Sequence, residues 1–262
     1  MKKALAYFRV SLTDALEYRG DIILYVLSGV ALPVTSLLLW NAVSFSESSS
    51  PLSPPELVRY YIFLLFVGTW VSSWTSYFLS RDIRLGKISP WLVKPAPFLL
   101  YQASNNISEK MLKTVYLTPI AFLLSFIFKF TWPSLSPSKW LLFGLTFILA
   151  AVIFFLIDIC LGLLAFWLDD SSAVREFYSI LNLIFSGRLL PLYTLPLIIQ
   201  NISFFLPFRY TLSLPLEIIL DKLSSMQLIQ GLIIQIIFLI ISFCLYKFLW
   251  SRGVRKYSAS GH

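Results

Sequence analysis

The chain has 262 residues and a formal net charge of +8, and 58% of its residues are hydrophobic. Only 13% are charged, about half the share of an ordinary soluble domain, and the mean hydropathy is +0.78, which together exclude a water-soluble globule. Apolar runs of about 20 residues, the length that crosses a bilayer, recur along the whole chain. They are continuously apolar, without the alternation of barrel strands. The composition therefore predicts an all-α, multi-pass membrane protein.

The first 21 residues precede the first long apolar run and are predicted to form an amphipathic helix on the inner membrane surface. Their apolar side chains recur at helical spacing, at Leu5, Phe8, Leu12 and Leu16. Charged residues interrupt this stretch, so it lacks the apolar core of a signal peptide. We expect the helix, over 1–21, to be retained.

A six-span transmembrane domain is predicted over 22–250. Its spans are expected at 22–43, 57–79, 112–128, 140–168, 174–195 and 228–250. An even number of spans puts both termini on one side, where most of the 21 Lys and Arg residues also fall, so the positive-inside rule makes both termini cytoplasmic. Residues 251–262 are then a cytoplasmic tail. The net charge indicates orientation and contact with anionic membrane lipid rather than nucleic-acid binding.

The sequence contains no pattern typical of an enzyme. The one histidine is His262, at the end of the chain, which disfavours a histidine-based metal site or catalytic triad. Gly86 and Lys87 resemble part of a phosphate-binding loop, but the position five residues before Gly86 is Arg81 instead of the required glycine. We expect no catalytic site, no metal and no cofactor in this chain, and any ATP would be bound by another subunit.

A cytoplasmic loop over 80–111 is predicted between the second and third spans. It begins with "SRDIRLGKISPWLVKPAPFLL", in which basic side chains alternate with apolar ones. One interpretation is a solvated connector with a basic face. The other is a surface covered by membrane or by a partner protein, because Ile83, Leu85 and Ile88 are too apolar for a free linker.

Two stretches carry a resemblance to a known family. "IRLGKISPWLVKP", over 83–95, resembles the loop after the second span of ABC-2 type exporter permeases, in a bacterial branch with the pattern I-R-x-G-x-I-S-x-x-L-x-K-P. "FSGRLLPLYTLPLIIQNISFFLPFRYTLSLPLEI", over 185–218, is similar to the Ser-Gly, Pro, Pro-Phe and final Pro pattern of that branch. The amphipathic start, the six spans and the tail also fit, so the resemblance covers nearly the whole chain.

The resemblance implies a homodimer or heterodimer of such subunits in the bacterial plasma (inner) membrane, each docked on a separate cytosolic ABC ATPase. It also implies a short coupling helix over 81–88 that sits in a cleft of the ATPase. Its expected residues are Leu85 and Ile88 as apolar anchors, Arg84 and Lys87 as polar contacts, Arg81 and Gly86 within the helix, and Trp91 and Leu92 where the chain turns back to the membrane.

The fifth predicted span is not a clean helix, because Gly187 and Pro191 interrupt it and Pro196 closes it. The resemblance implies short re-entrant helices at 197–205 and 212–220. This re-entrant region, over 197–220, also holds Pro207, Phe208 and Pro215. A plain extracellular loop is the alternative, which the apolar content of the region disfavours.

Asp158 and Arg188 are ionisable residues inside predicted spans, where a charge is costly. Counted from the turn between the fourth and fifth spans, they differ in depth by about 9 Å of helix, a gap that a long arginine can largely close. One interpretation is an ion pair. The other is that Arg188 extends outward while Asp158 bonds to a neighbouring span.

We therefore predict the membrane-spanning subunit of an ATP-driven exporter. Two other classes stay open: an ion-coupled secondary transporter and a non-transporting membrane scaffold or assembly factor. The secondary transporter predicts several carboxylates within the spans, and of these only Asp158 is evident in the sequence.

Overall fold

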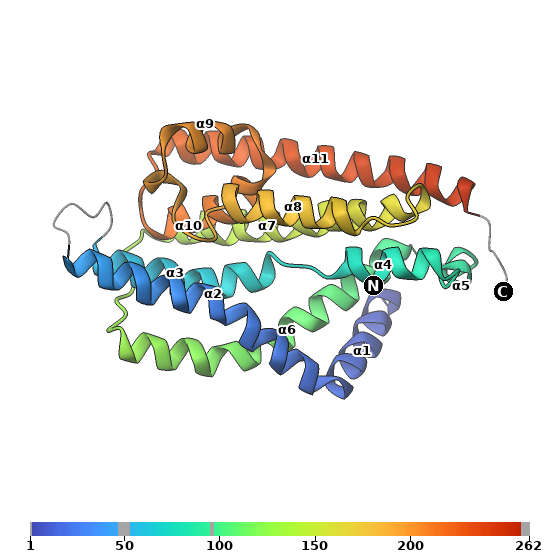
Figure 1. Ribbon diagram of the computed structural model, residues 1–262, viewed down its shortest axis with the longest axis horizontal. Helices are drawn as coiled ribbons and strands as arrows, with labels where there is room; N and C mark the ends of the chain where they lie inside the picture. The colour runs from blue at the N-terminus through green and yellow to red at the C-terminus, as the bar shows by residue number, and fades with distance from the viewer. Residues whose placement is uncertain (1, 47–52, 95–96, 258–262) are drawn as a thin grey trace.

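The computed structural model describes residues 2–46, 53–94 and 97–257, and every regular element within them is helical. The elements are α1 (Lys2–Glu17), α2 (Arg19–Ser46), α3 (Pro54–Trp70), α4 (Thr75–Arg84), α5 (Ser89–Leu92), α6 (Phe98–Ile127), α7 (Pro137–Leu163), η1 (Leu164–Phe166), α8 (Ser172–Phe185), η2 (Leu192–Thr194), α9 (Leu197–Phe205), the π-helix η3 (Arg209–Ser213), α10 (Leu214–Ile219) and α11 (Ser225–Lys256). In Figure 1, α5 lies towards one end of the molecule and α9 and α10 lie towards the other.

Five spans in the described residues are long and apolar enough to cross a membrane: α2, α3 together with α4, α6, α7 with η1, and α11. A sixth is counted if α9 and the η3–α10 segment, bent by 90°, form one broken span. The chain is thus an all-α membrane protein, as predicted. The predicted fifth span at 174–195 is not one continuous helix, as Gly187 and Pro191 indicated, because α8 ends at Phe185. α8 has only 14 residues, about 21 Å of helix, which is shorter than a bilayer core.

Two helices extend beyond the bounds of the predicted spans. α6 begins at Phe98 rather than Leu112, so the predicted loop over 80–111 is mostly helical. Lys110 consequently lies within a helix and is buried rather than in a basic loop, and Lys113 of the predicted third span is buried as well. At the other end of the chain, α11 continues to Lys256, so the predicted tail over 251–262 begins inside a helix, and its last five residues, including His262, lie outside the described residues.

Local sequence explains where α3 and α11 begin. At α3, Ser53 and Glu56 form a capping box, in which the Ser53 backbone N–H donates to the Glu56 carboxylate at 3.0 Å. At α11, the Ser224 backbone N–H donates to the Gln227 side chain at 2.9 Å in the same arrangement. Capping boxes satisfy N–H groups that a helix leaves free, so both starts are encoded locally.

The buried apolar residues form two clusters. One lies among α2, α3, α6, α7 and α10, and its most buried members include Leu37, Leu57, Tyr61, Leu64, Leu117 and Leu216. The other joins α4, α7, α11 and the start of α6, with Leu79, Ile83, Ile88, Ile159, Leu163 and Tyr246. α7 contributes to both, so it is the helix around which the others pack.

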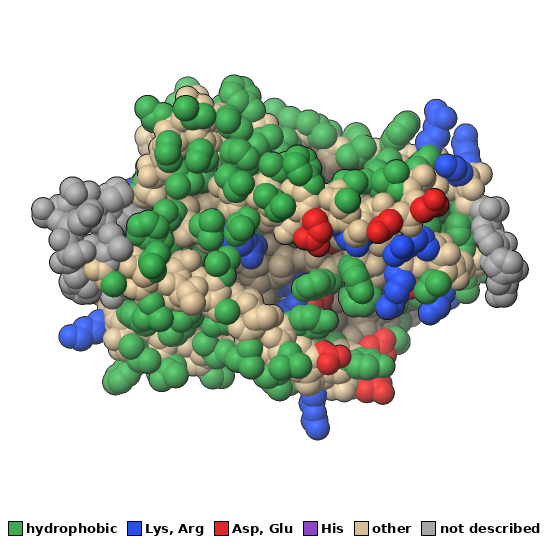
Figure 2. All heavy atoms as spheres, viewed as in Figure 1, with side chains coloured by type: hydrophobic (Ala, Val, Ile, Leu, Met, Phe, Trp, Pro, Cys, Tyr) green, Lys and Arg blue, Asp and Glu red, His purple; other side chains and the backbone are tan. Residues whose placement is uncertain are grey.

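Apolar side chains also cover much of the outer surface. Phe122 of α6, Leu141 of α7 and Ile240 of α11 expose 76%, 77% and 57% of their area. Exposed apolar surface on this scale is typical of contact with lipid. Figure 2 shows hydrophobic side chains over most of the face, and basic side chains gathered at the end that carries α5 and the C-terminal end of α11.

The N-terminal segment is helical, as predicted, although α1 ends at Glu17 and α2 begins at Arg19. α1 packs against α6, where Ser11 donates to the side chain of Asn105 and Ser108 donates to the carbonyl of Phe8. Leu5 and Leu16 of its predicted apolar face stay 52% and 49% exposed. That face is therefore free for a membrane surface, which stays a prediction.

Candidate functional site

The second membrane span is broken in its middle. α3 ends at Trp70, residues 71–74 are not helical, and α4 begins at Thr75. Such a break leaves carbonyl groups at the end of one helix and N–H groups at the start of the next without helical partners. Because lipid offers no replacement partner, other parts of the protein must supply one.

Asp158 of α7 supplies the partner for the start of α4. Its Oδ2 atom accepts a hydrogen bond from the Ser76 backbone N–H at 2.9 Å and one from the Ser73 hydroxyl at 2.6 Å. The residue is only 6% exposed. A carboxylate at a helix N-terminus is favoured by both the free N–H groups and the helix dipole. Asp158 therefore caps α4 from a different helix.

Arg188 lies at the other side of the same break. Its Nη2 atom donates to the Val71 carbonyl at the end of α3, at 3.4 Å, where a cation complements the helix dipole. No ion pair within 4.0 Å joins Arg188 to Asp158 among the described residues. The interpretation of the two as an ion pair is therefore wrong. Each serves a different end of one helix break, and Asp158 bonds to a neighbouring span as the alternative expected.

α6 adds polar residues to this site that the sequence analysis missed. Asn106 donates to the Ser73 hydroxyl at 3.2 Å, and Lys110, four residues further along the same helix, is 3% exposed. Both were assigned to a cytoplasmic loop. The signal that could have placed them is the helix-compatible stretch from Phe98 to Met111, which contains no proline or glycine.

A cleft of about 560 Å³ opens beside the break. Asp158 and Arg188 both line it, together with Ser72, Ser73, Trp74, Tyr178 and Asn182. Its walls come from the break, from α7 and from α8. The broken span thus places polar backbone and charged side chains beside a cavity, the setting in which irregular backbone is tolerated at membrane depth.

The predicted coupling helix over 81–88 is wrong, because α4 ends at Arg84. Gly86 has a φ of +71°, which favours glycine. The N–H of Lys87 bonds to the Asp82 carbonyl at 2.9 Å and that of Gly86 to the Ile83 carbonyl at 3.2 Å, the pattern of a Schellman helix end. Residues 85–93 therefore form a compact unit of a turn and the one-turn helix α5, here called the 85–93 turn.

The 85–93 turn separates the two expected apolar anchors. Leu85 is 59% exposed, whereas Ile88 is 1% exposed within the cluster of α4, α7 and α11. The expectation that Ile88 contacts a partner is wrong, since the turn directs its side chain inward. Val93, which was not among the expected anchors, is 84% exposed, and Leu92 is 36% exposed.

The remaining expected coupling residues have different surroundings. Arg81 and Lys87 are exposed. Arg84 donates to the Asp169 carbonyl at 3.3 Å. Trp91 stacks on Tyr101 with ring centroids 3.8 Å apart. Trp91 and Arg84 thus hold the turn against the rest of the chain, while Arg81 and Lys87 face outward.

Both described ends of the chain meet the 85–93 turn. The ring of Tyr7 lies 6.2 Å from that of Trp91, and the Tyr257 hydroxyl is 2.9 Å from that of Ser89. The two described chain ends therefore lie at one end of the molecule, which agrees with the count of six spans. At the same end, the Asp170 carboxylate accepts two bonds of 2.8 Å from Ser172, which lower the pKa of Asp170.

The predicted re-entrant region contains short helices, with α9 at the predicted position and the second piece beginning three residues early, at Arg209. Its prolines lie where helices begin. Pro191 and Pro196 precede η2 and α9, Pro207 and Phe208 separate α9 from η3, and Pro215 lies in the first turn of α10. Proline is favoured at such positions because its missing N–H has no helical partner there.

Tyrosines of α3 hold the segment that leads into this region. Tyr60 donates to the Gly187 carbonyl and Tyr61 donates to the Leu189 carbonyl, the latter at 2.7 Å. Gly187 has a φ of +84°, and a Cβ atom there would lie 3.0 Å from the Tyr60 hydroxyl. Glycine is thus required both by the backbone and by the neighbouring side chain.

Glu217 of α10 is a second buried carboxylate, which the sequence analysis missed. It is 1% exposed and accepts bonds from Arg209 at 2.9 Å and from Ser213 at 2.7 Å. The signal was the spacing of four and eight residues, which puts all three side chains on one helical face.

Among the described residues, no three His, Cys, Asp or Glu side chains come together as a metal-binding group. A comparison with curated proteins gives no match. The family model described as "ABC-2 family transporter protein" matches residues 30–261. That range contains the broken span, the 85–93 turn and the bent helices, and it covers most of the chain. The chain therefore belongs to the ABC-2 transporter family.

Proposed function

We propose that this membrane permease of an ABC transporter is the transmembrane subunit of an ATP-driven exporter, coupled to a separate cytosolic ATPase through the 85–93 turn. Membership of the family makes the chain a transport component rather than a catalytic enzyme. In this proposal the partner binds and hydrolyses ATP. A second permease subunit, identical or different, completes the complex in a bacterial inner membrane.

The observation that carries the proposal is the surface of the 85–93 turn. Leu85 and Val93 are 59% and 84% exposed, and Arg81 and Lys87 beside them are exposed cations. Exposed apolar side chains within a ring of charge are typical of a protein contact. The basic end of the molecule also carries both described chain ends, so the positive-inside rule favours the cytoplasm for it.

α4 connects this turn to the broken span. It has 10 residues, about 15 Å of helix, and its start is held by Asp158 of α7. A force on the 85–93 turn would therefore move α4 as one piece, and the break at 71–74 would absorb the change in angle. Closure of the ATPase would in this way reorient the spans around the cleft.

Glu217 is the one observation that favours an ion-coupled secondary transporter, because it adds a second buried carboxylate to Asp158. However, Glu217 is paired with Arg209 and bonded by Ser213. A carboxylate held by a fixed arginine is poorly suited to bind and release a cation. The exporter is therefore the function that the site supports best.

The test is co-purification of the partner ATPase with a permease that carries Leu85→Asp and Val93→Asp. Two charges placed in an apolar contact should abolish co-purification and any stimulation of ATP hydrolysis by the permease. Ile88→Asp is unsuitable because it would charge the core. Trp132→Asp is the matched control, since Trp132 is 75% exposed outside this turn. Undiminished binding by the double variant would overturn the proposal.

A further inference from the structure

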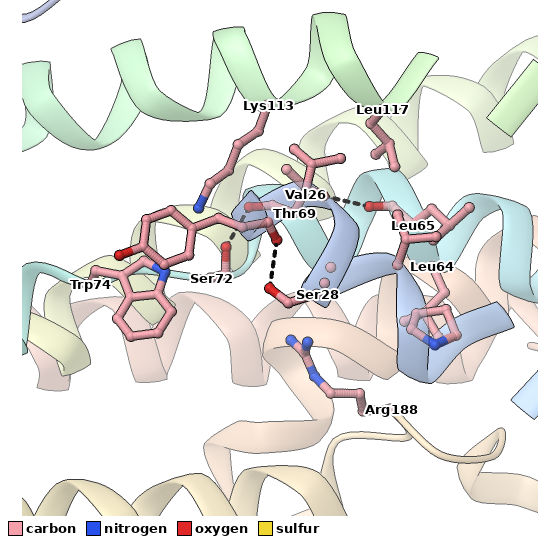
Figure 3. A pocket seen from close by; sticks show the side chains of 15 residues that line it. Val26, Ser28, Leu64, Leu65, Thr69, Ser72, Trp74, Lys113, Leu117 and Arg188 are labelled. Carbon is pink, nitrogen blue, oxygen red and sulfur yellow. Dashed lines mark hydrogen bonds between the residues drawn. The ribbon is translucent and has the colours of Figure 1, made fainter. Parts of the chain in front are cut away.

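A second cavity lies on the other side of Arg188, between α2, α3 and α6. It measures about 240 Å³, and its polar lining comprises Ser28, Thr69, Ser72, Trp74, Lys113 and Arg188. Figure 3 shows the Arg188 guanidinium and the Lys113 side chain directed towards it from opposite sides. This space is here called the Arg188 cavity. In the view of Figure 1, the space-filling picture of Figure 2 shows a hollow near the middle of the molecule, with basic side chains inside it.

The guanidinium of Arg188 is poorly satisfied within the chain. It has five N–H donors, but among the residues that the structure describes it makes one hydrogen bond, to the Val71 carbonyl at 3.4 Å. Its Nε atom is buried without a hydrogen-bond partner, and no carboxylate of the described residues lies within 4.0 Å of it. A buried charge without a counter-charge is costly, so this group is suited to receive an anion.

The charged residues around the Arg188 cavity also favour an anionic ligand. Lys113 is balanced, because its ammonium lies 2.5 Å from Glu109 and 5.3 Å from the Tyr25 ring centroid. Asp158 belongs to the neighbouring cleft, and neither Asp nor Glu is among the residues that line the Arg188 cavity. The net charge at its wall is therefore positive, and it comes from Arg188.

The rest of the lining is apolar. Val26, Val30 and Pro33 of α2 and Leu64, Leu65 and Leu117 of α3 and α6 form the remaining wall. A free inorganic ion would gain nothing from this wall, whereas a ligand with an apolar part would bury it there. The volume is below the range of about 300–1,000 Å³ that suits a whole drug-sized ligand, so it fits a head group and its first carbons.

We propose that the Arg188 cavity binds the anionic head group, a phosphate or carboxylate, of an amphiphile. Arg188 binds the anionic oxygens in a charge-assisted contact, and the α2–α3 wall receives the adjoining carbons. The identification of this amphiphile as the exported cargo rests on the proposed function. The binding itself does not depend on that function, because all of the binding residues belong to this chain.

The test measures the melting temperature of the purified subunit in neutral detergent with n-dodecyl phosphate, inorganic phosphate or dodecanol. Dodecyl phosphate should raise the melting temperature of the natural chain by about 5 °C near saturation. Arg188→Gln should lose this shift. Arg59→Gln should keep it, because Arg59 donates to Thr131 and does not line the cavity.

A second variant covers the case in which Arg188→Gln does not fold. Gly29 lines the cavity and has no atom within 4 Å of a built Cβ, so Gly29→Leu should fill the cavity and abolish the shift with Arg188 in place. Gly20→Leu is its control, since Gly20 also has open space around a Cβ but lies outside the cavity. The Leu85→Asp, Val93→Asp variant should keep the full shift, which separates this site from the ATPase contact.

Each other outcome overturns part or all of the proposal. An equal shift in Arg188→Gln, or in Gly29→Leu, would place the ligand elsewhere. An equal shift with dodecanol would show that apolar contact alone is responsible. An equal, Arg188-dependent shift with inorganic phosphate would assign the site to a free anion and exclude the amphiphile.

Discussion

The break between α3 and α4 and the 90° bend between α9 and the η3–α10 segment place irregular backbone beside a buried carboxylate. Asp158 at the break accepts from Ser73 and Ser76, which are 85 and 82 positions away in the chain. Glu217 near the bend accepts from Arg209 and Ser213, which are only eight and four positions away. The same chemistry is thus assembled between helices in one place and within one short segment in the other.

This difference predicts which region can rearrange more easily. Glu217 and its partners belong to one continuous segment, so they travel together and keep their bonds. Asp158 belongs to α7 and its donors belong to the broken span, so any rotation of α4 against α7 must break or exchange those bonds. We therefore expect the break to be the adjustable part of the molecule and the η3–α10 segment to move as one rigid piece.

Asp158→Ala should give the largest loss of stability. It leaves the Ser76 backbone N–H and the Ser73 hydroxyl without their acceptor, at about 1–3 kcal/mol for each unpaired buried donor. Asp158→Asn keeps an acceptor oxygen and should cost less than Asp158→Ala. Melting temperatures in detergent measure both, and equal values for the two variants would contradict the capping role.

Arg209→Met should come next, with a loss of about 2 kcal/mol, because it leaves the Glu217 carboxylate buried and unpaired. The figure stays moderate because the Arg209 side chain is 23% exposed and water screens part of the interaction. Adding Glu217→Gln should recover part of the loss. A double-mutant cycle gives the coupling, and additive effects would show that the pair does not stabilise the η3–α10 segment.

Gly187→Ala should cost about 1–2 kcal/mol, since an alanine is strained at a φ of +84°. The added Cβ would also lie 3.0 Å from the Tyr60 hydroxyl. Combining it with Tyr60→Phe should relieve the crowding but not the backbone strain. A melting temperature equal to that of the natural chain would show that this turn adopts another backbone conformation.

Lys139→Ala should have the smallest effect, below about 1 kcal/mol. Lys139 pairs with Asp221, but their side chains are 32% and 51% exposed, so solvent screens the charges. Thermal unfolding at low and high salt measures the contribution of this ion pair to stability. A loss of stability as large as that of Arg209→Met would show that solvent exposure does not determine how much each of the two ion pairs stabilises the protein.

The sequence located the regions of the candidate site better than it predicted the geometry within them. Continuous apolar runs identified the long spans, because that signal is local. The prolines indicated only where the chain is interrupted, and the short helices of the re-entrant region were predicted from the family resemblance. The break at 71–74 was missed, since nothing in Val71–Trp74 forbids a helix and its partner Asp158 lies on another helix. Ile88 was expected to contact a partner because it is apolar within a predicted loop and because the resemblance implies an anchor there, whereas the turn at Gly86, with its positive φ, directs Ile88 inward.

The claim most in need of a direct test is that the break lets α4 move with the 85–93 turn. Phe78 of α4 and Leu141 of α7 are both exposed, so each can be replaced by Cys and spin-labelled. The distance between the two labels reports the position of α4 relative to α7. The exposed Cys244 is replaced by Ser so that it is not labelled. In the complex with its ATPase, the distance distribution should shift between the nucleotide-free and ATP-bound states, and Leu85→Asp with Val93→Asp should abolish the shift. One unchanged distribution in both states, in a complex that hydrolyses ATP and transports, would contradict the account.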